Sequence, residues 1–303
     1  MRAELCAALV ARAGRPDMVF LTGDLGFMAL EPLRDRLGAR FINCGVAEQN
    51  MVGVAAALAR EGLEVWVYSI APFVYARAFE QIRNDICLHG LAVRLLGNGG
   101  GYGYGVMGPT HHALEDYGVL LTLPGMTVHL PAFNEDVAPI VARAAAAAGP
   151  CYIRLGRGEL PAGAVVPPYA PWRRLAAGDG PVVVAAGPLA GVAMAALAGL
   201  ADVGPELWVV SELPLTAGPP PAALAVRIAA SGRLCVIEEH VAQGGVGAML
   251  ALWALDAGVG LRGFRHLSAC GYPSRRYGSQ VFHRRESGLD ADSIRHAVQA
   301  LAT

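Results

Sequence analysis

The chain has 303 residues, of which 54% are hydrophobic and 16% charged, with a formal net charge of −1. This balance excludes a disordered protein and a basic nucleic-acid-binding surface, and no apolar run reaches the ~18 residues that a membrane span needs. Soluble proteins usually carry roughly 25% charged residues. The low charge and the mean hydropathy of +0.41 therefore predict that another subunit covers part of the surface. Six scattered cysteines and the lack of a signal-peptide pattern predict a cytoplasmic protein with free thiols.

Short apolar runs alternate with helical patterns along the first half of the chain. In chain order, the predicted elements are strand 18–22, helix 53–60, strand 65–68, helix 76–87, strand 93–96, helix 114–123, strand 127–130, helix 134–148 and strand 151–155. Such alternation is typical of a mostly parallel sheet with helices on both faces.

Composition changes after this run, because residues 156–181 are rich in Gly, Pro and Ala and are predicted to lack regular structure. A second alternating unit follows, with strand 182–186, helix 190–200, strand 207–211, helix 221–230, strand 233–238, helix 246–257 and a last helix at 291–301. We therefore predict an α/β protein with two doubly wound, mostly parallel sheets: a first domain at 1–160, a linker at 161–180 and a second domain at 181–303.

The segment with the most chemical content opens the helix that contains residues 53–60, and it reads Gly45-Val46-Ala47-Glu48-Gln49. By itself, a carboxylate at this place is explained by the favourable electrostatics of acidic residues at helix N-termini. Other stretches of the chain favour a larger role for Glu48.

Four motifs in register in the first domain, and one further stretch in the second, resemble the transketolase family, which includes the deoxyxylulose-phosphate synthases. The Glu48 segment resembles the GxAEQ segment of the family's pyrimidine-binding domain. Tyr68–Arg83 resemble its aromatic loop and the following helix, and Gly108-Pro109-Thr110-His111-His112 resemble its GPTH motif. Leu155-Gly156-Arg157 resemble the end of that domain, and Val236–His240 with Gly244–Gly247 resemble the family's third domain. The resemblance implies the two-domain α/β fold predicted above and a thiamine-diphosphate cofactor.

The resemblance also implies roles for single residues. Glu48 would hydrogen-bond N1′ of the cofactor's aminopyrimidine and favour the imino form, which removes the proton from thiazolium C2. Phe73 would stack on the aminopyrimidine, with Tyr75 and Tyr68 as alternatives and a core position as the competing interpretation. His111 would contact the substrate near the reacting carbons, unless it pairs locally on its loop.

Two other stretches match known binding motifs only in part. Asp24 matches a family aspartate close to the cofactor, although a strand-end aspartate also caps turns. Gly23-Asp24 with Asn43 resembles the GDG…N motif for Mg²⁺ and diphosphate, but Leu25 replaces the second glycine and Asn43 comes too early. We therefore predict no metal site in this chain. The glycine run at 99–105 lacks the following helix of a dinucleotide fingerprint.

Several positions depart from the family pattern for phosphate and hydroxyl contacts. Met107 stands where transketolases usually have an aspartate, Gly99 where they have a histidine, and Met28 where they have a serine. Arg157 matches a phosphate-binding arginine and Arg2 is a candidate for a second, while a plain surface charge stays open for Arg157. Either the substrate, a sugar or a sugar phosphate, differs from the family's usual sugar phosphates, or a partner subunit completes the site.

Transketolases carry an N-terminal diphosphate-binding domain that this chain does not resemble. The resemblance implies that a partner subunit supplies the diphosphate site and Mg²⁺, with two copies of each subunit. We predict ketol transfer from a ketose to an aldehyde. Transfer of an acyl unit to a lipoyl or carrier-protein thiol is the first alternative, although the GPTHH motif favours ketol transfer. A synthase fragment and a non-catalytic partner subunit are the others; Met107 and Gly99 favour the latter, and Glu48 and His111 oppose it.

Overall fold

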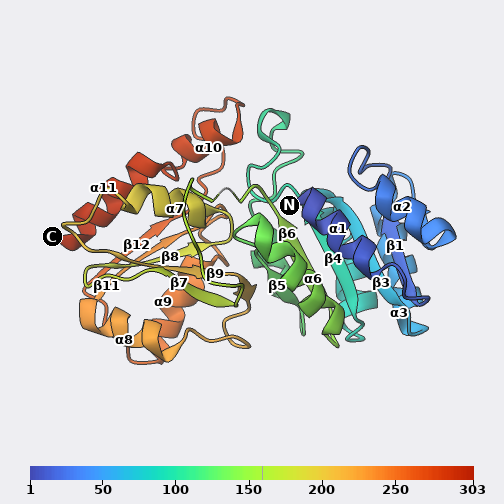
Figure 1. Ribbon diagram of the computed structural model, residues 1–303, viewed down its shortest axis with the longest axis horizontal. Helices are drawn as coiled ribbons and strands as arrows, with labels where there is room; N and C mark the ends of the chain where they lie inside the picture. The colour runs from blue at the N-terminus through green and yellow to red at the C-terminus, as the bar shows by residue number, and fades with distance from the viewer. Residues whose placement is uncertain (159) are drawn as a thin grey trace.

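The computed structural model describes residues 1–158 and 160–303, and its strands in these ranges form two sheets that lie next to each other (Figure 1). In the first sheet the strand order is β10-β5-β6-β4-β3-β1-β2, and in the second it is β12-β11-β8-β9-β7. All pairings are parallel except two edge pairings, β10 with β5 and β7 with β9. The predicted α/β class with two mostly parallel sheets is confirmed.

The first sheet consists of β1 (Met18–Thr22), β2 (Phe41–Asn43), β3 (Glu64–Ile70), β4 (Val93–Asn98), β5 (Thr127–His129), β6 (Cys151–Leu155) and β10 (Glu212–Leu213). One face is covered by α1 (Arg2–Arg12), α2 (Glu31–Leu37) and α6 (Val137–Ala146). The other is covered by α3 (Glu48–Arg60), α4 (Phe79–Gln81), α5 (Asp116–Leu120) and the wide helical turns Phe73–Arg77 and Ile82–Cys87. Alternate side chains of the strands enter the two cores, as in β1, where Phe20 faces α1 and Leu21 faces α3.

The second sheet consists of β7 (Trp172–Ala176), β8 (Val182–Ala186), β9 (Glu206–Val210), β11 (Arg233–Ile237) and β12 (Gly263–Leu267). Helices α7 (Leu189–Leu197) and α11 (Ala291–Ala302) pack on one face, α8 (Ala222–Ser231) and α9 (Val246–Asp256) lie on the other, and α10 (Gln280–Glu286) precedes α11. The core beneath α8 and α9 is continuous with the core beneath α3, so apolar packing joins the two sheets.

Four strands within the described residues were not predicted from the sequence, namely β2, β7, β10 and β12, and two of them, β7 and β10, bear on the domain organisation. Trp172–Ala176 form β7 inside the stretch that was predicted to lack regular structure, so that prediction is wrong at these residues. Glu212–Leu213 form β10, which leaves the second unit to pair with β5 of the first sheet. The domain boundaries stay a prediction, and this exchange shows that a single cut in the sequence does not separate the two sheets.

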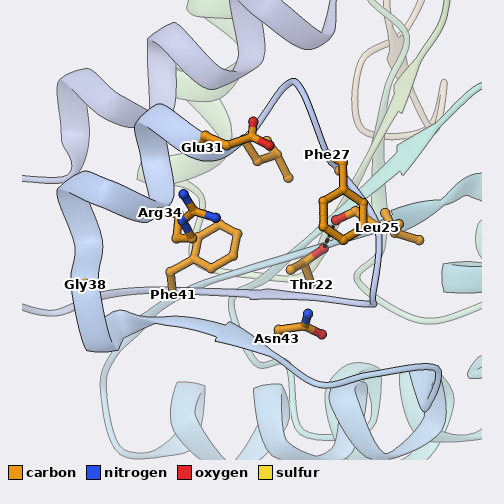
Figure 2. A pocket seen from close by; sticks show the side chains of 10 residues that line it. Thr22, Leu25, Phe27, Glu31, Arg34, Gly38, Phe41 and Asn43 are labelled. Atoms are coloured by element: carbon orange, nitrogen blue, oxygen red, sulfur yellow. Dashed lines mark hydrogen bonds between the residues drawn. The ribbon is translucent and has the colours of Figure 1, made fainter.

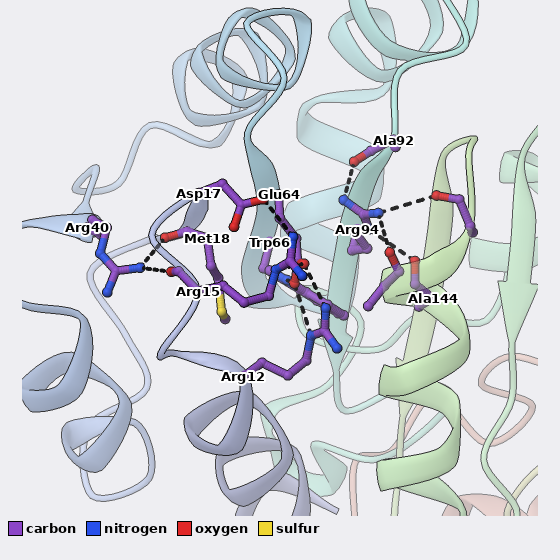
Figure 3. Close-up of polar contacts among 12 residues, drawn as sticks. Arg12, Arg15, Asp17, Met18, Arg40, Glu64, Trp66, Ala92, Arg94 and Ala144 are labelled. Carbon is purple, nitrogen blue, oxygen red and sulfur yellow. Dashed lines mark hydrogen bonds and ion pairs between the residues drawn. The ribbon is translucent and has the colours of Figure 1, made fainter.

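The carboxyl ends of the parallel strands lie together at one side of each sheet, and the loops that follow these ends position the candidate site. At the amino ends of the strands of the first sheet, charged side chains form hydrogen bonds that join neighbouring elements (Figure 3). There, Arg12 donates to both oxygens of Glu64, at 3.0 and 2.7 Å, and Trp66 Nε1 donates at 2.9 Å. Arg94 donates to backbone carbonyls, including Ala144 at 3.1 Å, and thereby ties β4 to the end of α6.

Glu64 should make the stability of the chain depend on pH. Its burial raises the pKa, but the hydrogen bonds from Arg12 and Trp66 outweigh burial and leave the pKa below its usual value of 4.5. Its stabilising contribution is therefore fully present above pH 4.5 and lost as pH falls through the lower folded-state pKa. We expect Glu64→Gln to lower the free energy of unfolding at pH 7 by about 2 kcal/mol, with the difference shrinking in chemical unfolding at pH 3. The matched control Asp35→Asn, on an exposed pair with Arg34, should shift stability by at most about 0.5 kcal/mol at either pH; a Glu64→Gln effect that grows in acid would contradict the assignment.

Candidate functional site

Glu48 is the first residue of α3, and its side chain is buried, with 4% exposed. The loop before it turns at Gly45, which has a φ of +68° and donates its backbone N–H to Asn43 Oδ1 at 2.9 Å. This turn aims the helix start at the carboxyl end of the sheet. Ser69 Oγ donates to Glu48 Oε1 at 3.3 Å, and Arg77 donates to Glu48 Oε2 at 2.9 Å. The carboxylate is thus buried with a partner for each oxygen, and a pocket of about 520 Å³ beside it is lined by residues 46–50 and Arg77.

Phe73 lies in the wide helical turn that follows β3, and its ring is half-buried. The guanidinium carbon of Arg77 stands 3.6 Å from the centre of this ring, and the His111 ring lies 5.2 Å away edge-on. Through Arg77 the ring therefore connects to Glu48. The other two aromatic candidates are buried in the core: Tyr75 donates its hydroxyl to Glu115 at 3.2 Å, and Tyr68 packs beside Phe20.

His111 occupies the loop of the Gly-Pro-Thr turn. Its Nδ1 is 2.8 Å from Thr110 Oγ1, and its ring centre is 5.6 Å from that of Tyr104. Tyr104 in turn accepts a hydrogen bond from Asn98 at 2.7 Å. Side chains from three loops, after β3, after β4 and before α5, therefore meet at this point.

The two basic candidates share a pocket next to Tyr104. Arg2 and Arg157, together with Asn98 and Gly99, line a cavity of about 280 Å³. Arg2 reaches it because α1 begins beside the end of β6, where Met1 Sδ receives the backbone N–H of Gly156. The prediction that both arginines bind substrate is thus consistent with one shared location.

Asp24 lies at the end of β1 and is exposed. It accepts a hydrogen bond from the Asn43 amide at 3.0 Å, so the two residues that resemble a metal motif bond to each other. A pocket of about 340 Å³ on this side of the molecule is lined mainly by apolar groups, including Leu25, Phe27 and Phe41 (Figure 2). Within residues 1–158 and 160–303, no group of three or more His, Cys, Asp and Glu side chains has the arrangement to hold a metal ion.

The second unit holds the glycine loop that carries Tyr104. The buried Glu239 accepts the backbone N–H of Tyr102 at 2.6 Å, and Arg284 donates to its other oxygen at 2.6 Å. A Cβ at Gly101, whose φ is +64°, would lie 2.6 Å from Glu239, so only glycine fits there. Arg154 adds a link, because it donates to Asp116 and to the backbone carbonyls of Ala113 and Glu239.

His112 has a structural role in the same region. Its Nε2 lies 2.9 Å from the carbonyl oxygen of Gly105 and its Nδ1 lies 2.8 Å from the Tyr272 hydroxyl. Burial lowers its pKa, which favours a neutral ring that bonds on both sides. It therefore fixes the loop beside His111.

Sequence reasoning identified the Arg77 helix but gave Arg77 no role in the site, and it missed Tyr104. The spacing of Arg77, four residues after Phe73 in a helical segment, is a signal that could have found it. Tyr104 carried no such signal, because its place depends on how the second unit folds the glycine loop. None of the helices within the described residues is long and apolar enough to cross a membrane.

Known proteins resemble this chain along most of its length. The profile of the family described as "Transketolase, pyrimidine binding domain" matches residues 6–162. An apulose-4-phosphate transketolase subunit of Phocaeicola vulgatus is 34% identical over 77% of this chain and 76% of its own length. The 1-deoxy-D-xylulose-5-phosphate synthase 2 of Geobacter sulfurreducens is 34% identical over 87% of this chain, which spans only 42% of that enzyme. Among solved structures, a split gene transketolase in an inactive β4 tetramer superposes with a TM-score of 0.82 at 29% identity, over 99% of this chain and 97% of its own.

These matches show that the chain belongs to the transketolase family. Within that family it is similar to separate subunits over most of their length and to single-chain enzymes over less than half of theirs. The predicted resemblance to the C-terminal, pyrimidine-binding subunit of a split transketolase is confirmed.

Proposed function

We propose that this chain is the second subunit of a cytoplasmic, two-subunit thiamine-diphosphate-dependent transketolase that transfers a two-carbon ketol unit from a ketose to an aldehyde. The observation that supports this proposal most is the geometry of Glu48, a buried carboxylate whose partner Arg77 also lies over the half-buried ring of Phe73. An aminopyrimidine needs both features: a hydrogen-bonding edge and a flat apolar face.

The residues present fit the aminopyrimidine half of the cofactor. Glu48 would hold the proton shared with N1′, and Phe73 would stack on the ring in place of the core residues Tyr75 and Tyr68. Asp24, at the end of β1, would lie at the rim. When bound, thiamine diphosphate supplies the electron sink for breaking and making the carbon–carbon bond.

His111 and the arginine pocket would serve the substrate. The His111 ring adjoins Phe73, so it is placed to donate a hydrogen bond to a substrate oxygen or to move its proton. Arg2 and Arg157 line the neighbouring pocket and would hold the phosphate of a sugar phosphate. This arrangement favours phosphorylated substrates even though Met107, Gly99 and Met28 replace the family's usual polar groups.

Arg157→Ala is therefore expected to raise KM for a phosphorylated substrate by about 10- to 100-fold, the effect of losing a charge-assisted hydrogen bond. The same change should alter KM for the unphosphorylated sugar by less than about threefold. Arg174→Ala, an exposed arginine on β7, is the control. Equal losses on both sugars would remove the phosphate role.

We propose that Mg²⁺ and the diphosphate are held by the partner subunit, and that two copies of each subunit assemble. Support comes from the similarity to subunits that exist as separate chains and from exposed apolar side chains next to site residues. Phe27 and Met28 follow Asp24, Val46 precedes Glu48, and Val106 and Met107 precede the Gly-Pro-Thr turn; Met28 is 97% exposed. An exposed apolar surface of this kind marks a contact with another protein.

Reconstitution tests the proposal. The chain is co-purified with a candidate partner that carries a GDG…N motif and is assayed with thiamine diphosphate, Mg²⁺ and a panel of free and phosphorylated ketoses and aldehydes. Ketol transfer by the pair, and not by either chain alone, is expected. Full activity of this chain alone would contradict the split arrangement, acyl transfer to a lipoyl or carrier-protein thiol would establish the alternative reaction, and an assembled pair without turnover would indicate a non-catalytic subunit.

A further inference from the structure

Arg77 contacts both groups that the proposed function assigns to the aminopyrimidine. Its Nη1 donates to Glu48 Oε2 at 2.9 Å, and its guanidinium carbon lies 3.6 Å from the centre of the Phe73 ring. Resting on the proposed function, we infer that Arg77 is a gate: in the cofactor-free chain it occupies the place of the aminopyrimidine, and it must swing out before the cofactor binds.

The two occupants exclude each other for steric reasons. A separation of 3.6 Å is van der Waals contact, so no second planar group fits between the guanidinium and Phe73. The guanidinium is itself flat, stacks on aromatic faces and offers N–H donors to a carboxylate. It therefore satisfies the same ring face and the same carboxylate edge that the aminopyrimidine would use.

The surroundings of Arg77 permit this movement. Its side chain is 42% exposed, whereas that of Glu48 is 4% exposed. Arg77 also forms one wall of the pocket of about 520 Å³ beside Glu48, so the guanidinium has space into which it can rotate. Because the Arg77 end of the ion pair is exposed to water, the pair and the cation–π contact are both weakened, and a ligand that itself bonds to Glu48 can replace them.

The gate has a consequence for the free subunit. A buried carboxylate without a partner is unfavourable, and Arg77 supplies that partner until the cofactor does. The contact also lowers the apparent affinity for the cofactor, because only the fraction of molecules with an open gate can bind it. From the strengths of the two contacts we expect this reduction to be about 3- to 30-fold.

The test is the dissociation constant of thiamine diphosphate, measured by calorimetry at saturating Mg²⁺ on the assembled pair of subunits. Arg77→Ala should bind the cofactor about 3- to 30-fold more tightly than the unchanged enzyme. Arg77→Lys keeps the charge but not the flat group and should lie between the two. The control is Arg83→Ala, an exposed arginine further along the same helical segment, which should leave the constant unchanged. Thermal unfolding of each variant checks that the fold is retained.

An unchanged or weaker affinity in Arg77→Ala would overturn the gate. A separate arm keeps this result distinct from failure of the proposed function: Glu48→Ala should weaken cofactor binding. If Glu48→Ala binds the cofactor as the unchanged enzyme does, both the assignment of Glu48 and the gate fall. If Glu48→Ala weakens binding while Arg77→Ala does not tighten it, only the gate falls.

Discussion

Glu48→Gln is expected to lower kcat of the assembled enzyme by about 10²- to 10⁴-fold, which is the contribution typical of a positioned proton-transfer group. Glutamine has nearly the same shape and keeps one carbonyl oxygen that can accept from Arg77, while its amide can donate to the Ser69 hydroxyl, so the start of α3 should stay folded. It cannot hold or release a proton at the cofactor's N1′. The loss should therefore appear in kcat, measured in the reconstituted pair at saturating cofactor and substrate.

The matched control lies on the same helix. Glu61 follows the last turn of α3 and is exposed, so Glu61→Gln should retain the kcat of the unchanged enzyme. Co-purification with the partner shows whether either variant assembles. A Glu48→Gln enzyme that assembles, binds the cofactor and turns over at the normal rate would rule out a proton-handling role for this carboxylate.

Asp136→Ala is expected to lower the free energy of unfolding by about 3–5 kcal/mol, because it leaves the partner charge buried and unpaired. Asp136 accepts two hydrogen bonds from Arg173, at 2.8 and 2.6 Å, and both side chains are 2% exposed. It also accepts the backbone N–H groups of Ala132 and Phe133 just before α6. One carboxylate thus joins α6 of the first sheet to β7 of the second.

A series of variants separates these contributions. Asp136→Asn keeps an acceptor for the backbone groups and should cost less than Asp136→Ala. The double variant Asp136→Ala with Arg173→Met removes both charges and should recover part of the loss, whereas Asp292→Ala, at an exposed pair, should change stability by at most about 0.5 kcal/mol. Chemical unfolding at pH 7 is the measurement. A double variant less stable than Asp136→Ala alone would show that the buried charge is not what matters.

The buried strands of the fold could be predicted well from the sequence, because uninterrupted apolar runs of strand length between turn residues, such as Val182–Ala186, are typical of fully buried strands. Prediction failed for elements whose composition is mixed. Trp172–Ala176 contain two arginines and follow a proline, and they form a strand because Arg173 finds Asp136 and because β9 offers a free edge. The segment's own sequence does not reveal either partner, Asp136 or β9, because both contacts form only in the tertiary structure.

The candidate site shows the same division. Glu48, Phe73 and His111 were predicted from local motifs, and the structure brings two of them, Phe73 and His111, into contact and links Phe73 to Glu48 through Arg77. The sequence left open whether Phe73 or Tyr75 would stack on the aminopyrimidine. The two residues lie two positions apart in a wide helical turn, and the geometry of that turn decides which ring enters the core. The role of Glu239 was also hidden, since its partner Tyr102 is 137 residues away.

Strand β10 limits where this protein can be truncated or recombined with a relative. Leu213 and Glu212 pair with β5, Ser211 accepts the backbone N–H of Leu130, and Arg143 on α6 binds Glu212 at 2.5 Å. A shortened product that stops in the predicted linker would leave β5 as an open edge, which is a template for aggregation. Chimeras that exchange the first unit with that of a relative should therefore exchange residues 211–213 as a separate second segment, because a single junction after residue 213 would also replace β7, β8 and β9 of the second sheet.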